Sequence, residues 1–140
     1  MTRLSRSTVR LLAVTAVTFA GGSAWAITGG SVHSGFLGEW VPTAAACTSP
    51  LKLVIDAHSV TFVNGAQRAD FRKLEQCFSC AGRDVQGVTM LSTDAMGDSP
   101  FMITLDESRK GRKTMSVDFS NDKQLAARFP FGKGGLKRCG

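Results

Sequence analysis

The sequence predicts an all-β fold, a small antiparallel barrel or sandwich of about seven or eight short strands stapled by disulfides. Three observations carry this prediction. Apolar and polar residues alternate in short runs, turn residues separate the runs at intervals of about 8–15 residues, and little of the chain has helical periodicity. A length of 140 residues with 43% apolar and 20% charged side chains is typical of one globular domain.

The first 26 residues are predicted to be a secretory signal peptide. Arg3, Arg6 and Arg10 precede an apolar stretch over residues 11–20, and Ala24-Trp25-Ala26 forms a small-x-small cleavage site. The apolar part is shorter than the roughly 20 residues that a membrane-spanning helix needs. We therefore expect cleavage after Ala26, a periplasmic or secreted protein, and no membrane span in the mature chain.

The remaining chain is expected to form a flexible lead-in followed by one β domain. Residues 27–35 are small and polar, and the domain is expected to occupy residues 36–140. Alternating runs predict strands over residues 51–56, 60–62, 85–92, 101–106, 114–119 and 125–129, with Pro130 suited to a strand end. Asn64-Gly65 indicates a tight hairpin turn, residues 107–113 a polar hairpin loop around Gly111, and residues 94–100 a loop.

One segment fits two structures. In residues 69–80, Phe71, Leu74 and Phe78 have helical spacing, but Leu74, Phe78 and Cys80 also fit one face of a strand. We favour a strand there.

The four cysteines, Cys47, Cys77, Cys80 and Cys139, indicate two structural disulfides in an exported chain. If residues 77–80 are extended, the two Cα atoms lie about 10 Å apart, beyond the reach of a disulfide. If they form a turn, Cys77 bonds Cys80 and Cys47 bonds Cys139. We favour the extended form, in which Cys77 and Cys80 have separate partners.

Cys77-Phe78-Ser79-Cys80 also raises the alternative of an envelope thiol–disulfide enzyme. The surrounding pattern is not β-α-β, and the residues between the cysteines carry no cation to lower a thiol pKa. A zinc site would need a second close pair of ligands, and none follows. The sequence therefore favours no metal and no cofactor.

Other catalytic patterns are incomplete. The chain has no Gly-x-Ser-x-Gly elbow, and Gly132-Lys133-Gly134-Gly135 lacks the Ser or Thr of a phosphate-binding loop. Asp56 and His58 flank a predicted turn, which favours a solvated turn over a catalytic pair. We expect no enzymatic activity.

Charge is distributed unevenly along the predicted mature chain. Residues 27–108 carry five basic and nine acidic side chains, whereas residues 109–140 carry nine basic and two acidic ones. The basic side chains that we expect to contact a partner are Arg109, Lys110, Arg112, Lys113, Lys133, Lys137 and Arg138. The first four share one predicted hairpin loop. The expected partner is an acidic protein or an anionic envelope surface, because an exported protein rarely meets nucleic acid.

Gly38-Glu39-Trp40 resembles the Gly-x-Trp that opens the first strand of lipocalin-like (calycin) barrels. The resemblance implies an up-and-down barrel of eight strands, with Trp40 as a core aromatic that plugs one end. Small exported bacterial members include inhibitors of proteases and lysozymes. The resemblance therefore implies a binding role and no catalytic residues. The sequence thus predicts an exported, non-enzymatic binding or inhibitory module of the cell envelope.

Overall fold

The structure is a computed structural model, which describes residues 30–82, 84–93, 97–119 and 121–140. The predicted signal peptide and residues 27–29 of the lead-in lie outside this range. Within it the chain forms nine strands and one short helix. In chain order they are β1 (Gly38–Pro42), β2 (Leu51–Ile55), β3 (Val60–Asn64), β4 (Gln67–Phe71), β5 (Leu74–Cys77), β6 (Val88–Thr93), β7 (Met102–Arg109), β8 (Arg112–Asp118), α1 (Lys123–Arg128) and β9 (Leu136–Cys139).

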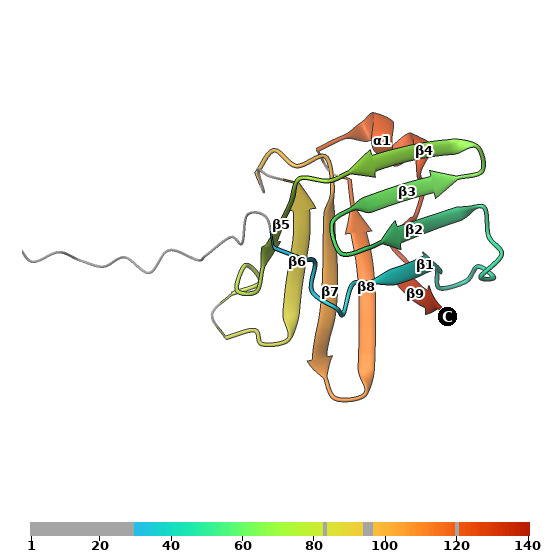
Figure 1. Cartoon of the computed structure of the whole chain (residues 1–140). Coiled ribbons are helices and arrows are strands. Elements are labelled where there is room, and N and C mark those ends of the chain that lie inside the picture. The colour runs from blue at the N-terminus through green and yellow to red at the C-terminus, as the bar shows by residue number, and fades with distance from the viewer. Residues whose placement is uncertain (1–29, 83, 94–96, 120) are drawn as a thin grey trace, which may run out of the picture.

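All nine strands belong to one antiparallel sheet, in the order β4-β3-β2-β1-β9-β8-β7-β6-β5. Neighbours in the sheet are neighbours in the chain, except where β1 pairs with β9. This pairing joins the first strand to the last and nearly closes the sheet into a barrel, with β4 and β5 as its edges (Figure 1). The all-β antiparallel fold, predicted as a barrel or a sandwich of seven or eight strands, is confirmed as a barrel-like sheet, with nine strands in the described residues. Of residues 69–80, where a strand was favoured, 69–71 and 74–77 lie in β4 and β5, whereas 78–80 form bends and a turn.

Aromatic side chains fill the core enclosed by the sheet. The ring of Phe62, on β3, lies 5.0 Å from that of Phe101 and 5.2 Å from that of Phe119, both edge-on. Phe129 and Phe131 pack against the same ring at 5.8 and 6.0 Å. Such edge-to-face contacts add to the stability gained from burial itself.

A segment that we call the strap, residues 31–37, is packed rather than flexible where the structure describes it. Val32 is 4% exposed and Phe36 is fully buried. The Val32 N–H donates to the Ala57 carbonyl in the β2–β3 turn at 2.8 Å, and the Gln76 side chain of β5 accepts from the His33 N–H. The expectation of a flexible lead-in is wrong for these residues, because two apolar side chains among the small polar ones reach the core.

The strand predicted over residues 125–129 is wrong, because α1 occupies this segment. The Asp122 side chain caps the helix by accepting from the Leu125 N–H at 2.8 Å. Leu125 and Phe129 are four residues apart, which places both on one helical face toward the core. In this short run the apolar residues fit a strand at a spacing of two and a helix at a spacing of four. The N-cap that Asp122 provides favours the helix.

The β7–β8 hairpin is longer than predicted. Both strands continue through residues expected to be a loop, so the turn consists only of Lys110 and Gly111. Gly111 has φ +76°, a conformation that glycine adopts without the strain of a side chain.

The disulfides are Cys47–Cys139 and Cys77–Cys80, each with a Cα–Cα distance of 5.6 Å. The preference for separate partners of Cys77 and Cys80 is therefore wrong. Strand β5 ends at Cys77 and the next residues bend, which brings the two Cα atoms well within the distance expected for an extended segment. Cys47–Cys139 joins the β1–β2 connection to β9, the strand that closes the sheet.

Candidate interaction surface

The β7–β8 hairpin carries the first group of predicted partner-binding residues. It reaches beyond the ends of the other strands at the lower edge of Figure 1. Arg109, Lys110, Arg112 and Lys113 surround its two-residue turn, and all four are exposed. The structure thus brings these four residues together at the tip of one hairpin, which we call the basic tip.

Like charges face each other at the basic tip. Arg109 lies directly opposite Arg112 in the strand pairing, an arrangement that costs stability in an isolated hairpin. Neither guanidinium forms an ion pair within the described part of the chain. Lys113 differs, because its Nζ lies 2.8 Å from Glu107 Oε1. The unneutralised charge of the tip therefore resides on Arg109, Lys110 and Arg112.

The base of the hairpin is braced. Glu107 N–H donates to the Gly87 carbonyl at 2.7 Å, just before β6 begins. A Cβ on Gly87 would come within 2.9 Å of the Ser108 backbone, so only glycine allows this approach. The pairing also shifts register between Asp106 and Arg109, and such irregularities re-aim the end of a strand.

A carboxylate stabilises this irregular stretch. Asp106 accepts hydrogen bonds from the Ser108 hydroxyl and, at 2.9 Å, from the Ser108 N–H. These bonds favour the ionised form and hold the pKa of Asp106 below its ordinary value of 3.8. Asp106 therefore stays negatively charged at neutral pH, three residues from the first arginine of the tip.

The second group of predicted partner-binding residues does not form one cluster with the tip. Lys133 lies beside the hairpin, where it lines a depression with Asp106 and Thr114. Lys137 and Arg138 are successive residues of β9 and so point to opposite faces of the sheet. Arg138 lies opposite Trp40, and its Nε is 2.9 Å from where a Cβ on Gly38 would stand.

Trp40 lies in β1 and is 1% exposed, and its indole N–H donates to the Phe36 carbonyl at 2.7 Å. The residue is therefore a core aromatic, as predicted, and it anchors the strap where the strap enters the barrel.

The cysteine pair Cys77–Cys80 lies at the end of an edge strand, and turns follow it. Cys77 is 7% exposed and Cys80 is exposed. Phe78 between them is 47% exposed, and its ring lies 5.9 Å from that of His33 in the strap. A strand followed by turns differs from the helix N-terminus that lowers the thiol pKa in many redox pairs.

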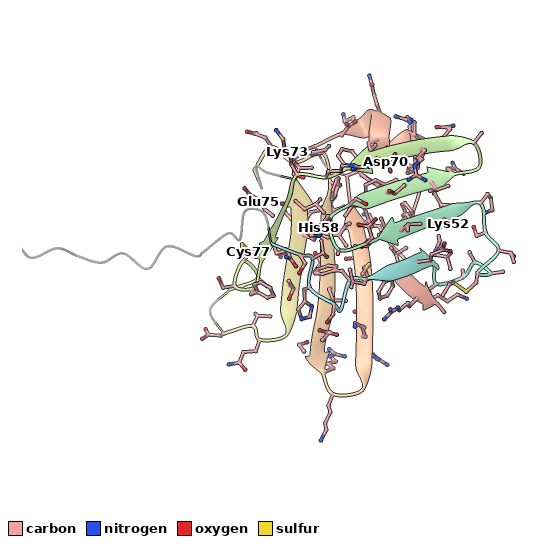
Figure 2. The ribbon with its side chains drawn as sticks, in the orientation of Figure 1. Lys52, His58, Asp70, Lys73, Glu75 and Cys77 are labelled. Carbon is pink, nitrogen blue, oxygen red and sulfur yellow. A yellow bond between two sulfur atoms is a disulfide. The ribbon has the colours of Figure 1, made fainter. Side chains whose placement is uncertain are left out.

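Titratable side chains of the other elements form isolated pairs in the described residues, Lys52 with Glu39 at 3.3 Å and Arg68 with Asp70 at 2.8 Å. Figure 2 shows Lys52 on β2 well apart from Glu75 on β5, with His58 of the β2–β3 turn between them in this view. Asp56 accepts from the His58 N–H at 2.9 Å and from the Ser59 hydroxyl at 2.8 Å, which lowers its pKa from 3.8. Asp56 is thus the carboxylate of a solvated turn, as predicted.

Sequence reasoning missed a polar depression on the outer face of β7 and β8. Its floor includes Thr104, Thr114 and Ser116. In the sequence these residues are the polar positions of an alternating pattern, which predicts that they lie on the exposed face of a strand. The pattern does not predict which loops border that face.

Comparisons with protein-family models, with curated proteins and with solved structures found no match. Within the residues that the structure describes, no helix is long and apolar enough to cross a membrane.

Proposed function

We propose that this protein is an exported, non-enzymatic binding module whose basic tip docks into an acidic cleft of a partner protein, which it inhibits where that partner is an enzyme. The observation that carries the proposal is the pairing of Arg109 with Arg112 at the end of a braced, projecting hairpin. A partner carboxylate placed between the two guanidiniums would relieve their repulsion and gain two charge-assisted bonds. A local conflict of this kind is expected at functional sites.

Export is supported by the signal pattern of residues 1–26 and by the two disulfides, which persist in oxidising compartments. The calycin-like relationship is part of the same proposal. It is supported by the position of Trp40, buried on the first strand of a barrel-like sheet whose first and last strands pair.

An acidic protein is favoured over an anionic membrane surface by the shape and composition of the tip. The hairpin is narrow and projecting, which suits a cleft. Residues 109–113 include no large apolar side chain that would anchor the tip among lipid tails.

The test uses the oxidised protein as bait for envelope proteins, followed by association kinetics with the purified partner. Replacing Lys110 and Arg112 with Glu is expected to slow association at least tenfold, because the reversed charges remove electrostatic steering. Raising the salt concentration should slow the wild type in the same way, since screening lengths are about 8–10 Å.

The control is Lys123→Glu on α1, which reverses a single charge away from the hairpin and should leave the rate nearly unchanged. An association rate that changes neither with the tip substitutions nor with the salt concentration would contradict the proposal. If the protein binds anionic vesicles and no protein partner is captured, the partner of the basic tip is a lipid surface and the acidic-cleft proposal is wrong.

The alternative function, thiol–disulfide exchange, draws its support from the exposure of Cys80 within a closed Cys-x-x-Cys disulfide. An exchange enzyme would reduce the disulfides of insulin in the presence of a dithiol, and Cys77→Ser would abolish that activity. We expect no such activity and a cysteine pair that resists reduction.

A further inference from the structure

Two depressions on the outer face of β7 and β8 adjoin each other and share lining residues. One has a volume of about 380 Å³ and the other about 480 Å³. Both are lined by Thr104 and Ser116, which therefore stand at the junction. We call the combined hollow the hydroxyl trough.

The floor of the hydroxyl trough consists of side chains that the strand register places on one face of the sheet. Thr104 lies opposite Ser116, and Asp106 lies opposite Thr114. Directly opposed residues of an antiparallel pair project to the same side. Within the described residues, the hydroxyls of Thr104, Thr114 and Ser116 form no hydrogen bond with the rest of the chain, so all three are available to a ligand.

Loops that are tied in place form two walls. At one end, the Asn121 side chain donates to the Gly97 and Ser99 carbonyls at 3.2 and 3.1 Å. On the other side, Thr43 N–H donates to the Gly135 carbonyl at 3.1 Å. Strand β9 pairs with β8 at Leu136, and the loop before it lines the trough with Lys133, Gly134 and Gly135. Both walls exist without a ligand, which lowers the entropic cost of binding.

The lining selects the chemical class of the ligand. Asp106 and Asp118 contribute carboxylates and Lys133 one ammonium, which together disfavour phosphates and other anions. Hydroxyls and carboxylates side by side match a ligand whose own hydroxyls both donate and accept. Met90 and Met102 add apolar surface for the C–H face of such a ligand.

A peptide fits this floor less well. An added strand binds through free backbone groups at a sheet edge, whereas the trough lies over the paired faces of β7 and β8 and is lined by their side chains. Recognition in the hydroxyl trough must therefore come from side chains.

We propose that the hydroxyl trough binds a neutral oligosaccharide chain, with Thr104 and Ser116 at its centre and Lys133 at its wall. The site is separate from the basic tip and does not depend on the proposed docking of that tip.

The test is a titration of the oxidised full chain, followed by amide NMR, with three neutral hexasaccharides (cellohexaose, maltohexaose and chitohexaose) and with anionic hexagalacturonate. At least one neutral sugar is expected to shift the resonances of Thr104 and Ser116 in a saturable manner. Hexagalacturonate is expected to bind at least tenfold more weakly, because the two carboxylates repel it.

Thr104→Val combined with Ser116→Ala is expected to weaken sugar binding at least tenfold. Lys133→Met is expected to weaken it by a smaller factor. Thr48→Val and Lys137→Met are the matched controls, since both residues are exposed and line neither half of the trough. The tip variant with Glu at positions 110 and 112 should bind sugar normally, which separates this inference from the proposed function.

Three results would overturn the inference. They are the absence of binding by all three neutral sugars, equal binding of hexagalacturonate, and unchanged affinity of a Thr104/Ser116 double variant whose spectrum shows the native fold.

Discussion

Single polar side chains hold the strap in place. Gln76 is 4% exposed, and its amide bridges two strap residues by donating to the Ser31 carbonyl at 3.0 Å and accepting from the His33 N–H. A buried side chain that satisfies two backbone groups is costly to remove, because both groups then lose their partner. At the residue scale, Gln76 is therefore a determinant of order at the N-terminal side of the barrel.

Gln76→Leu is expected to destabilise the protein by about 2 kcal/mol and to raise hydrogen exchange in residues 31–37 selectively. Hydrogen-exchange mass spectrometry and urea unfolding measure the two effects. Gln86→Leu, at an exposed loop position, is the control and should change neither. Equal exchange of the strap in both variants would show that apolar packing alone holds it.

A second prediction at this scale concerns acid. The Arg68 guanidinium and the Thr61 hydroxyl hydrogen-bond Asp70 and hold the pKa of its carboxyl below 3.8. A lowered native pKa contributes stability that is complete above the unfolded value and is lost as the pH falls through the native value. Wild-type stability should therefore fall below about pH 4, and Asp70→Asn should flatten this part of the profile. Thermal unfolding between pH 2 and pH 6 measures it, and an unchanged slope in the variant would contradict the assignment.

At the scale of elements, the helix α1 depends on its cap more than on its length. A helix of six residues is too short to be stable alone, so burial of Leu125 and the Asp122 cap must supply its stability. Contacts to the β3–β4 hairpin add to this, since Asn64 Nδ2 donates to the Arg128 carbonyl at 2.9 Å and Arg128 donates to the Arg68 carbonyl at 3.2 Å.

Asp122→Ala is expected to cost about 1 kcal/mol, the usual effect of removing an N-cap. Asp122→Asn should retain most of the stability, because an amide oxygen caps equally well. Urea denaturation of the two variants measures the difference. Similar losses in both would indicate that the charge of Asp122, rather than the capping bond, stabilises the helix.

At the scale of the whole molecule, closure of the barrel depends on contacts between the two ends of the domain. Strand β1 pairs with β9 over Glu39↔Cys139 to Pro42↔Leu136, and Cys47–Cys139 ties the β1–β2 connection to β9 across a sequence separation of 92. Cys77–Cys80 spans a separation of three. The stabilisation from a cross-link rises with the length of chain that it encloses, so the two disulfides should contribute unequally.

Replacing Cys47 and Cys139 with Ala is expected to cost about 4 kcal/mol, against about 2 kcal/mol for the same change at Cys77 and Cys80. The comparison of the two double variants by urea unfolding under oxidising conditions measures this order. A larger loss from the Cys77/Cys80 variant would mean that the small disulfide supports the strap and β5 beyond its effect on chain entropy.

By itself the sequence determined the all-β class, several of the strands and the β3–β4 turn of this protein. Alternation over residues 51–56 and 101–106 predicted β2 and β7, because a half-buried strand needs apolar side chains at every second position. Asn64-Gly65 predicted the turn between β3 and β4, where Gly65 has φ +58°. The sequence also predicted that the four cations of the basic tip would lie together, since they fall within five consecutive residues.

Only the tertiary structure decided the features that depend on residues distant in sequence. The bond of Cys77 to Cys80 depends on where β5 ends. The burial of Val32 depends on hydrogen bonds of the strap with Gln76 and Ala57. The walls of the hydroxyl trough come from loops far apart in the chain, the loop before β9 on one side and the contact of Asn121 with Ser99 at one end. Local periodicity reports which face of a strand is buried, but which elements meet is set by packing across the whole barrel.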